Sequence, residues 1–207
     1  KVADSLEIYR FLAPPDLRGD GVVDVTPQGR TALDVSFKSD GAADYRFLGE
    51  NLTLTQPSGK VLIRGERVTI ENLKLNAFNG PVAARFDFRG KGLLEGEMTW
   101  TRLSIPELTS TYGFQIHGGG QVTGRLDFSI HDGKVETMDG EGLFALEKTE
   151  LFSVPMFGPL SPLVSGVLND KRAGFERAKS AFCTFRIEDG ILSPRDFRTA
   201  TKSLTFA

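Results

Sequence analysis

The chain has 207 residues, with 25 Lys and Arg against 27 Asp and Glu, which gives a net charge of −2. This length predicts one domain, and scattered basic residues in a nearly neutral chain argue against a nucleic-acid partner. No apolar run reaches the roughly 18 residues that a membrane-spanning helix needs, and a single cysteine, Cys183, excludes a disulfide within the chain. Glycine, at 23 residues, and phenylalanine, at 16, are both frequent.

The first expected element is a short helix. Val2, Leu6 and Tyr9 recur with a spacing close to the helical period, and Pro14-Pro15 ends the pattern. We therefore assign residues 1–15 to a lead helix.

From Gly21 onward the apolar period changes to two, which predicts strands with one apolar and one polar face. The clearest alternating runs are residues 31–38, 81–89, 94–100 and 121–130, with shorter ones near residues 52–54, 61–63 and 68–70. Turn-forming sequences separate these runs at residues 39–41, 57–59, 79–80, 132–133 and 189–190. Together they predict a curved antiparallel β-meander over residues 21–157 in a mostly β protein with two short helices.

The second helix is expected at residues 159–168. Its apolar residues fall at i, i+3, i+4, i+7 and i+8 from Leu160, which makes one wide apolar face. Pro159 suits the first turn of such a helix, because its missing N–H is not needed there. We expect this helix to act as a lid at one end of the apolar face. Closing strands are expected over residues 175–207, and the abrupt end of the chain suggests a piece of a longer protein.

Residues 80–88 and 120–128 resemble each other at an offset of 40, which indicates a hairpin-scale repeat. The two runs place their apolar side chains on one face, and this wall is the candidate binding site: Val82, Ala84, Phe86, Phe88, Val122, Leu126, Phe128 and Ile130. Two interpretations fit the alternation equally well. The wall is the core of a closed β-sandwich, or it is the open concave face of a curved sheet that holds acyl chains.

Catalytic candidates are few. His117 precedes a glycine run and His131 lies in an expected turn, so both fit solvated loop histidines. The acidic residues at 136–141 lack the spacing of a calcium loop, and no nucleophile elbow, zinc helix or phosphate loop is present. Cys183 lies in an expected strand between phenylalanines, where a small buried side chain is the ordinary role. We expect no enzyme activity, no metal and no cofactor.

The second half of the chain resembles the C-terminal region of AsmA-like bacterial envelope proteins. The resemblance rests on the order and spacing of short segments: GEMTWTRLSIPEL at residues 96–108, GQVTGRLDF at 120–128, DGEG at 139–142, LFSVPMFGPL at 151–160, then Phe175, Arg177 and FRIEDG at 185–190. It covers the chain best from about residue 92 to the end, whereas residues 21–90 match only as a glycine-punctuated meander.

This resemblance implies a taco-shaped β-groove related to repeating β-groove lipid-transfer proteins. It implies a non-enzymatic role in binding or shielding phospholipid acyl chains, in lipid transport between membranes or in outer-membrane homeostasis. The expected location is the periplasm, with an inner-membrane anchor outside this chain, phospholipid as the ligand and other envelope proteins as further partners. The alternative is a closed β-sandwich, a structural or adhesive module whose polar face binds protein or glycan.

Overall fold

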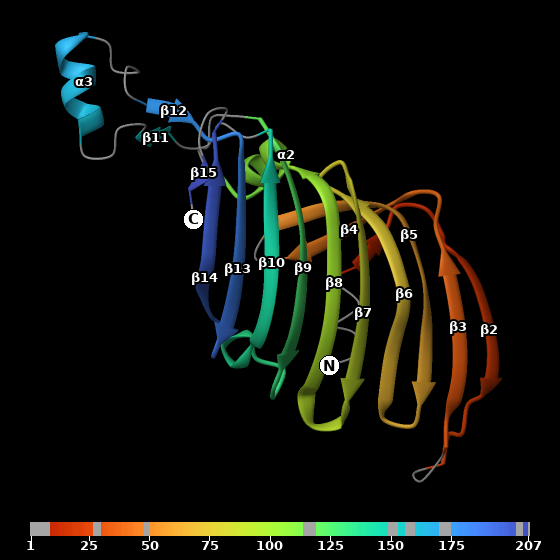
Figure 1. The fold of residues 1–207 in the computed structure, drawn as a ribbon. Helices are drawn as coiled ribbons and strands as arrows, with labels where there is room; N and C mark the ends of the chain where they lie inside the picture. Colours follow the sequence, from red (N-terminus) through yellow and green to blue (C-terminus); the bar gives the residue numbers. More distant parts are fainter. Residues whose placement is uncertain are drawn as a thin grey trace.

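A computed structural model of the protein describes residues 9–26, 30–47, 50–113, 119–148, 153–155, 160–169, 175–201 and 205–206. These residues form a mostly antiparallel β structure with two short helices (Figure 1), which confirms the predicted fold class. Of the described strands, thirteen belong to one open sheet, and two more form a small separate two-stranded sheet. Within the described residues, no helix is long and apolar enough to cross a membrane.

The main path of the sheet runs in the order β1-β4-β5-β6-β7-β8-β9-β10-β13-β14-β15, and β2 joins it through β3, which pairs with β5. The strands are β1 (Tyr9–Phe11), β2 (Asp16–Val22), β3 (Ala32–Lys38), β4 (Ala42–Phe47), β5 (Glu50–Arg64), β6 (Arg67–Ala77), β7 (Gly80–Arg89), β8 (Leu93–Ser104), β9 (Gln121–Ile130), β10 (Asp139–Glu147), β11 (Ser153–Pro155), β12 (Phe175–Arg177), β13 (Ser180–Glu188), β14 (Ile191–Ala200) and β15 (Thr205–Phe206). The helices are α2 (Ile105–Thr111) and α3 (Ser161–Val167), with short 3-10 turns at Gly90–Gly92 and Val135–Thr137.

The meander from β6 to β10 follows the predicted alternation, since each neighbouring pair is antiparallel. The turn predicted at residues 79–80 connects β6 to β7 through Phe78 and Asn79, both with positive φ. Asp189 and Gly190, also with positive φ, connect β13 to β14. Positive φ at both central residues matches the right-handed twist of the strands, so these two turn predictions are confirmed.

The turn predicted at residues 57–59 is wrong, because β5 continues through Pro57 as one long strand. The first half of β5 pairs with β4 and the second half with β3. The ladder to β6 shifts register here, and Gln56 has a φ of 54°. Proline lacks the N–H of a regular ladder and is tolerated at such a β-bulge. Residues 39–41 separate β3 from β4, but the two strands both pair with β5 and lie end to end along it.

Further bulges bend the sheet in the neighbouring strands. Asn72 in β6 and Arg102 in β8 also have positive φ, and the register shifts beside each of them. Each bulge adds one residue, so the apolar side chains return to the same face beyond it. This explains how Leu73 and Leu103 stay on the apolar face after an interruption of the alternation.

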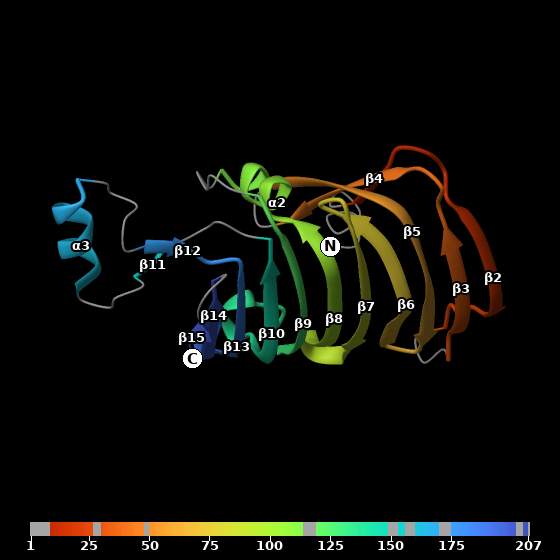
Figure 2. The ribbon, with the colours of Figure 1, turned by 45° about the horizontal axis from the view of Figure 1, so that its top comes forward.

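The bend in β5 places a second layer over one end of the sheet, as Figure 2 shows. We call this layer, made of β1, β4 and residues 50–55 of β5, the roof. Leu52 and Leu54 of the roof form a buried cluster with Ala77 at the end of β6. The partly buried hydrophobic side chains packed against this cluster are Tyr45, Leu75, Phe78, Val82 and Tyr112.

The predicted lead helix is wrong where the structure describes it. Tyr9–Phe11 form β1, which pairs with β4, and Leu12 to Pro15 form no helix. The apolar spacing at residues 9–12 fits a strand edge as well as a helix, and pairing with β4 decides between them. Residues 1–8 lie outside the described residues.

Helix α2 was not predicted, although its N-terminus has a clear sequence signal. The Ser104 Oγ accepts a hydrogen bond from the Glu107 N–H at 3.4 Å, and Pro106 lies in the first turn. Serine followed by glutamate three residues later is the pattern of a capping box. Ile105 and Thr109 of this helix are buried.

We expect Ser104→Ala to lower the free energy of unfolding by about 1 kcal/mol, because it removes the cap from the first turn of α2. Urea denaturation followed by circular dichroism measures this loss. Ser36→Ala, on an exposed position of β3, is the matched control and should change the stability by less than about 0.5 kcal/mol. Equal losses in the two variants would show that the cap contributes nothing.

The predicted helix at residues 159–168 is confirmed over Ser161–Val167, which form α3. The predicted lid is wrong, because Leu160, Leu163 and Leu168 are exposed and Val167 is 85% exposed. In Figures 1 and 2 the helix lies beside the two-stranded sheet of β11 and β12, away from the main sheet. Of the closing strands expected over residues 175–207, β13, β14 and β15 belong to the main sheet, whereas β12 pairs with β11 in the separate two-stranded sheet.

Candidate binding face

The eight residues of the predicted apolar wall lie on one face of the sheet. They come from β7 and β9, which flank β8, and the register aligns them in rows across the three strands. One row is Phe88, Leu94 and Ile130, the next is Phe86, Gly96 and Phe128, and the third is Ala84, Met98 and Leu126. Val82 lies opposite Trp100, and Val122 lies opposite Leu103 beyond the bulge in β8.

Aromatic rings on this face lie over glycines of the adjacent strand. A Cβ added to Gly96 would lie 2.6 Å from the Phe128 ring and 3.0 Å from the Phe86 ring. The same arrangement places Trp100 over Gly124 and Phe185 over Gly142. Because glycine has no side chain, each ring lies flat against the sheet. We call the resulting flat apolar face of β7, β8 and β9 the floor. This packing accounts for part of the glycine and phenylalanine excess.

The rings also contact one another along the floor. The Phe86 and Phe128 rings have centroids 6.3 Å apart at an interplanar angle of 61°, and the Phe86 and Phe88 centroids are 6.4 Å apart. Edge-to-face pairs at this separation add about 0.5–1.5 kcal/mol beyond the area that they bury. The floor therefore has a defined shape.

The same face continues on both sides of the predicted wall. Toward β3 it includes Val68 and Ile70 of β6, then Val61 and Ile63 of β5. Toward β14 it includes Phe144 of β10, followed by Cys183, Phe185 and Ile187 of β13. The apolar face thus extends across the sheet, well beyond the two strands that the sequence singled out.

Exposure differs between the two ends of the wall. Val82 packs against the roof, whereas Phe88, at the other end of β7, is 39% exposed. The remaining wall residues are partly buried and keep some contact with solvent. The face is therefore covered beside the roof and open at the far ends of β7, β8 and β9.

Charged side chains occupy the opposite face. Asp87 is buried there between two arginines: the Arg67 Nε and Nη2 donate to its two carboxylate oxygens at 2.7 and 2.6 Å, and the Arg89 Nε donates at 3.0 Å. The hydrogen bonds from Arg67, followed by those from Arg89, hold the pKa of Asp87 well below its usual value. Arg89 also pairs with Glu95 at 2.6 Å.

Further ion pairs cover the same side. Asp34 pairs with Lys60 at 2.8 Å and with Arg64, and hydrogen bonds from these two cations lower the pKa of Asp34. Arg125 pairs with Asp127 at 2.8 Å. These charges stay off the apolar face because strand residues alternate between the two faces.

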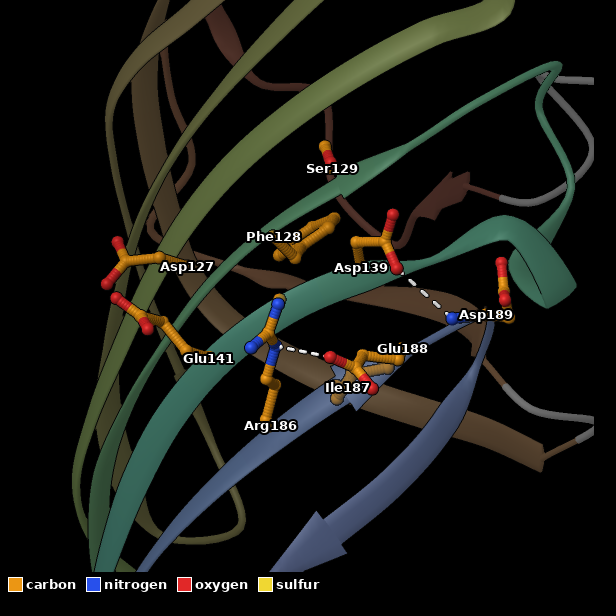
Figure 3. A pocket seen from close by; sticks show the side chains of 10 residues that line it. Asp127, Phe128, Ser129, Asp139, Glu141, Arg186, Ile187, Glu188 and Asp189 are labelled. Carbon is orange, nitrogen blue, oxygen red and sulfur yellow. Dashed lines mark hydrogen bonds and ion pairs between the residues drawn. The ribbon is translucent and has the colours of Figure 1, made fainter. Parts of the chain in front are cut away.

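A shallow hollow of about 720 Å³ lies on the charged side of β9, β10 and β13 (Figure 3). Asp127, Glu141 and Arg186 line it, and the Arg186 Nε pairs with Glu188 at 2.8 Å. The lining is mostly charged and the hollow is wide open, so it does not suit an apolar ligand. Among the described residues, no group of three or more His, Cys, Asp or Glu is placed to hold a metal ion.

In the described part of the chain, the contacts of the weak catalytic candidates do not support a catalytic role. His131 is exposed in the turn after β9, where its backbone binds the Thr137 hydroxyl. Cys183 is buried as predicted, its Sγ donates to the Thr184 carbonyl at 3.3 Å, and burial raises the pKa of its thiol. His117 lies outside the described residues.

Sequence reasoning missed the part of the face that β8 supplies. Leu94, Met98 and Trp100 lie between the two predicted halves of the wall. Their alternation was visible in the sequence, but only the pairing of β8 with both β7 and β9 places them at the centre.

Comparison with protein-family models, with curated proteins and with solved structures gives no match for this chain. The AsmA-like resemblance therefore stays a prediction that rests on the segments quoted above.

Proposed function

We propose that the protein is a non-enzymatic carrier that binds or shields the acyl chains of phospholipids on the apolar face of its sheet. The observation that carries this proposal is a continuous, partly exposed apolar face with the ion pairs on the other side. A soluble protein rarely leaves a large contiguous apolar surface open unless it binds something there.

The chemistry of the floor suits an acyl chain. Moving one CH₂ group out of water gains about 0.8 kcal/mol, so a chain that covers a few rows of the face would bind measurably. The side chains of Ala84, Phe86 and Leu126 carry no hydrogen-bonding group that would fix a ligand at one position. A chain held by such a surface remains able to slide along it.

The alternative of a closed β-sandwich has less support. Two packed sheets would be needed, and the described residues form one large open sheet with a small two-stranded sheet beside it. In the described residues, the roof covers the face around the cluster of Leu52, Leu54 and Ala77 and the side chains packed against it. An adhesive role on the charged face remains the second candidate, and the open hollow beside Arg186 is the observation that favours it.

The AsmA-like resemblance supports the setting of the proposed function. We propose, as this resemblance implies, a location in the periplasm of a bacterium with two membranes and an anchor outside this chain. Lipid transport between the membranes, or outer-membrane homeostasis, is the role that we propose there.

Native mass spectrometry of detergent-free protein, taken from cells with ordinary phospholipids, tests the binding. We expect adducts of phospholipid mass on the wild type. They should be lost from Phe86→Asp and from Phe128→Asp, because a carboxylate at the centre of the floor would have to be desolvated beneath the acyl chain. Thr99→Asp introduces the same group on the charged face of β8 and is the matched control, which should keep its adducts.

Circular dichroism must show that the aspartate variants remain folded. A second readout avoids this requirement, since a phospholipid with a photoreactive acyl chain should label peptides of β7, β8 and β9 in the wild type. A wild-type protein with no adducts and no labelling from added vesicles would overturn the proposal.

A further inference from the structure

The two outermost long strands of the sheet have open edges and exposed apolar side chains. In β2, Leu17 is 63% and Val22 is 64% exposed. In β14, Ile191 is 69% and Leu192 is 54% exposed. Within the described residues, β2 pairs only with β3, and the outer side of β14 is paired only at Thr199 and Ala200, by β15. An open strand edge is a template for pairing with another chain.

The direction of the two edge strands allows them to pair with each other across two molecules. Every neighbouring pair from β2 through β3 and β5 to β14 is antiparallel, and the strand order makes β2 and β14 run in opposite directions. A second copy placed beside the first in the same orientation would therefore add β2 antiparallel to β14. The apolar faces of the two copies would then lie on the same side.

We propose that the β14 edge of one copy pairs with the β2 edge of a second copy of this chain. The charges on the polar faces of the two strands are complementary in one register, which sets Arg198 opposite Asp16 and Asp196 opposite Arg18. Among the described residues, Asp16, Arg18 and Arg198 form no ion pair, and all three are exposed. Opposite charges across an antiparallel pair contribute roughly 0.2–1 kcal/mol each and help to select the register.

The apolar faces fit in the same register. Arg195 is the extra residue at the bulge of β14, since Thr184 lies opposite Asp196 and Phe185 opposite Pro194. On the apolar face, Phe197 lies opposite Leu17 and, without Arg195 in the count, Leu192 lies opposite Gly21, whereas Ile191 and Val22 meet on the charged face. A bulky side chain beside a glycine repeats the arrangement of the floor, where Phe128 lies over Gly96.

The same side chains make other registers of the two strands unfavourable. A shift by two residues in one direction sets Arg198 against Arg18 and Asp196 against Asp20, and a shift in the other direction sets Asp196 against Asp16. A shift by one residue would place the apolar side chains on the charged face. Two β14 strands cannot pair symmetrically about Phe197, because β15 occupies the edge at Thr199 and Ala200.

The contact is heterologous, so it does not close on itself and joins copies into rows. Each added copy prolongs the apolar face. The pairing of the two edges does not depend on acyl-chain binding. Its test measures the mass of the assembly and not the amount of bound lipid, so the two proposals can fail separately.

Sedimentation velocity of the full chain over a wide concentration range tests the proposal. The average mass of the wild type should rise with concentration above the monomer value of 22.6 kDa. Arg18→Asp and Asp196→Arg should each remain monomeric, because each sets like charges opposite one another. Lys134→Asp makes the same charge change in an exposed turn and should assemble like the wild type.

Recombining the two variants gives the decisive result. A mixture of Arg18→Asp with Asp196→Arg should assemble, because every contact between unlike copies then has opposite charges. The double variant Arg18→Asp/Asp196→Arg should assemble by itself for the same reason. A monomeric wild type, or single variants that assemble like the wild type, would overturn the proposal.

A cysteine pair provides a readout that does not depend on charge reversal. Ser193 lies opposite Asp20 in the proposed register, so Ser193→Cys mixed with Asp20→Cys should form a cross-linked dimer on oxidation. Lys134→Cys mixed with Asp20→Cys is the matched control and should not cross-link. Equal cross-linking in the two mixtures would also contradict the proposed register.

Discussion

Gly142→Ala should lower the free energy of unfolding by about 2–3 kcal/mol, the cost of overpacking a well-packed site. The added Cβ would lie 2.5 Å from the Arg125 carbonyl oxygen on β9 and 2.5 Å from the Phe185 ring on β13. The carbonyl belongs to the sheet backbone and cannot move away. Phe185 is only 6% exposed and has little free space for a different rotamer.

Chemical denaturation of the wild type and Gly142→Ala measures this effect. Gly119→Ala is the matched control, because a Cβ at Gly119 would meet no atom within 4 Å. It should change the stability by less than about 0.5 kcal/mol. If the two variants unfold at the same denaturant concentration, the Phe185 ring does not lie over Gly142 as described.

Asp87→Asn should lower the free energy of unfolding by about 2 kcal/mol at neutral pH. The carboxylate is buried and accepts charge-assisted hydrogen bonds from Arg67 and Arg89, and such bonds are stronger than neutral ones. Both arginines are about half exposed, and water can replace part of the lost contact, so we expect the lower part of the usual range. Urea unfolding at neutral pH measures the loss.

The loss from Asp87→Asn should shrink in acid. The pKa of Asp87 is lowered in the folded protein, so the carboxylate stabilises the fold above the unfolded-state pKa of about 3.9. That contribution fades as the pH falls below about 4 toward the lowered pKa. Wild type and variant should therefore converge in stability with acidification. Glu136→Gln, in an exposed turn, is the control, and a constant difference for Asp87→Asn at all pH values would contradict the linkage.

Local alternation in the sequence predicted the meander well, because a strand with one apolar face shows its period directly. The strands from β6 to β10 and β13 follow this pattern, and the turns at Asn79 and Asp189 carry typical turn residues. The roof could not be predicted in the same way. Pro57 has the sequence of a turn, and only the change of partner from β4 to β3 shows that it is a bulge within one strand.

The candidate face was predictable in part for the same reason. The alternation of β7 and β9 put Phe86 and Phe128 on one face, and their register across β8 brings them together. The covered end near Val82 was not predictable, because Leu52 and Ala77 meet only after β5 bends. Ser104 and Glu107 form the sequence pattern that predicts the N-terminus of α2. The alternating apolar pattern of the strands on both sides of it led the prediction to strand instead.

The roof also makes the two ends of the apolar face different from each other. Leu52 and Leu54 close the end beside Val82, whereas Phe88 and the turn that follows it are open to water. Under the proposed function, an amphiphile on this face would have one favourable orientation, with its methyl end under the roof and its headgroup at the open end beside Phe88. Such a surface would hold a row of molecules side by side, all pointing the same way, like one leaflet of a bilayer.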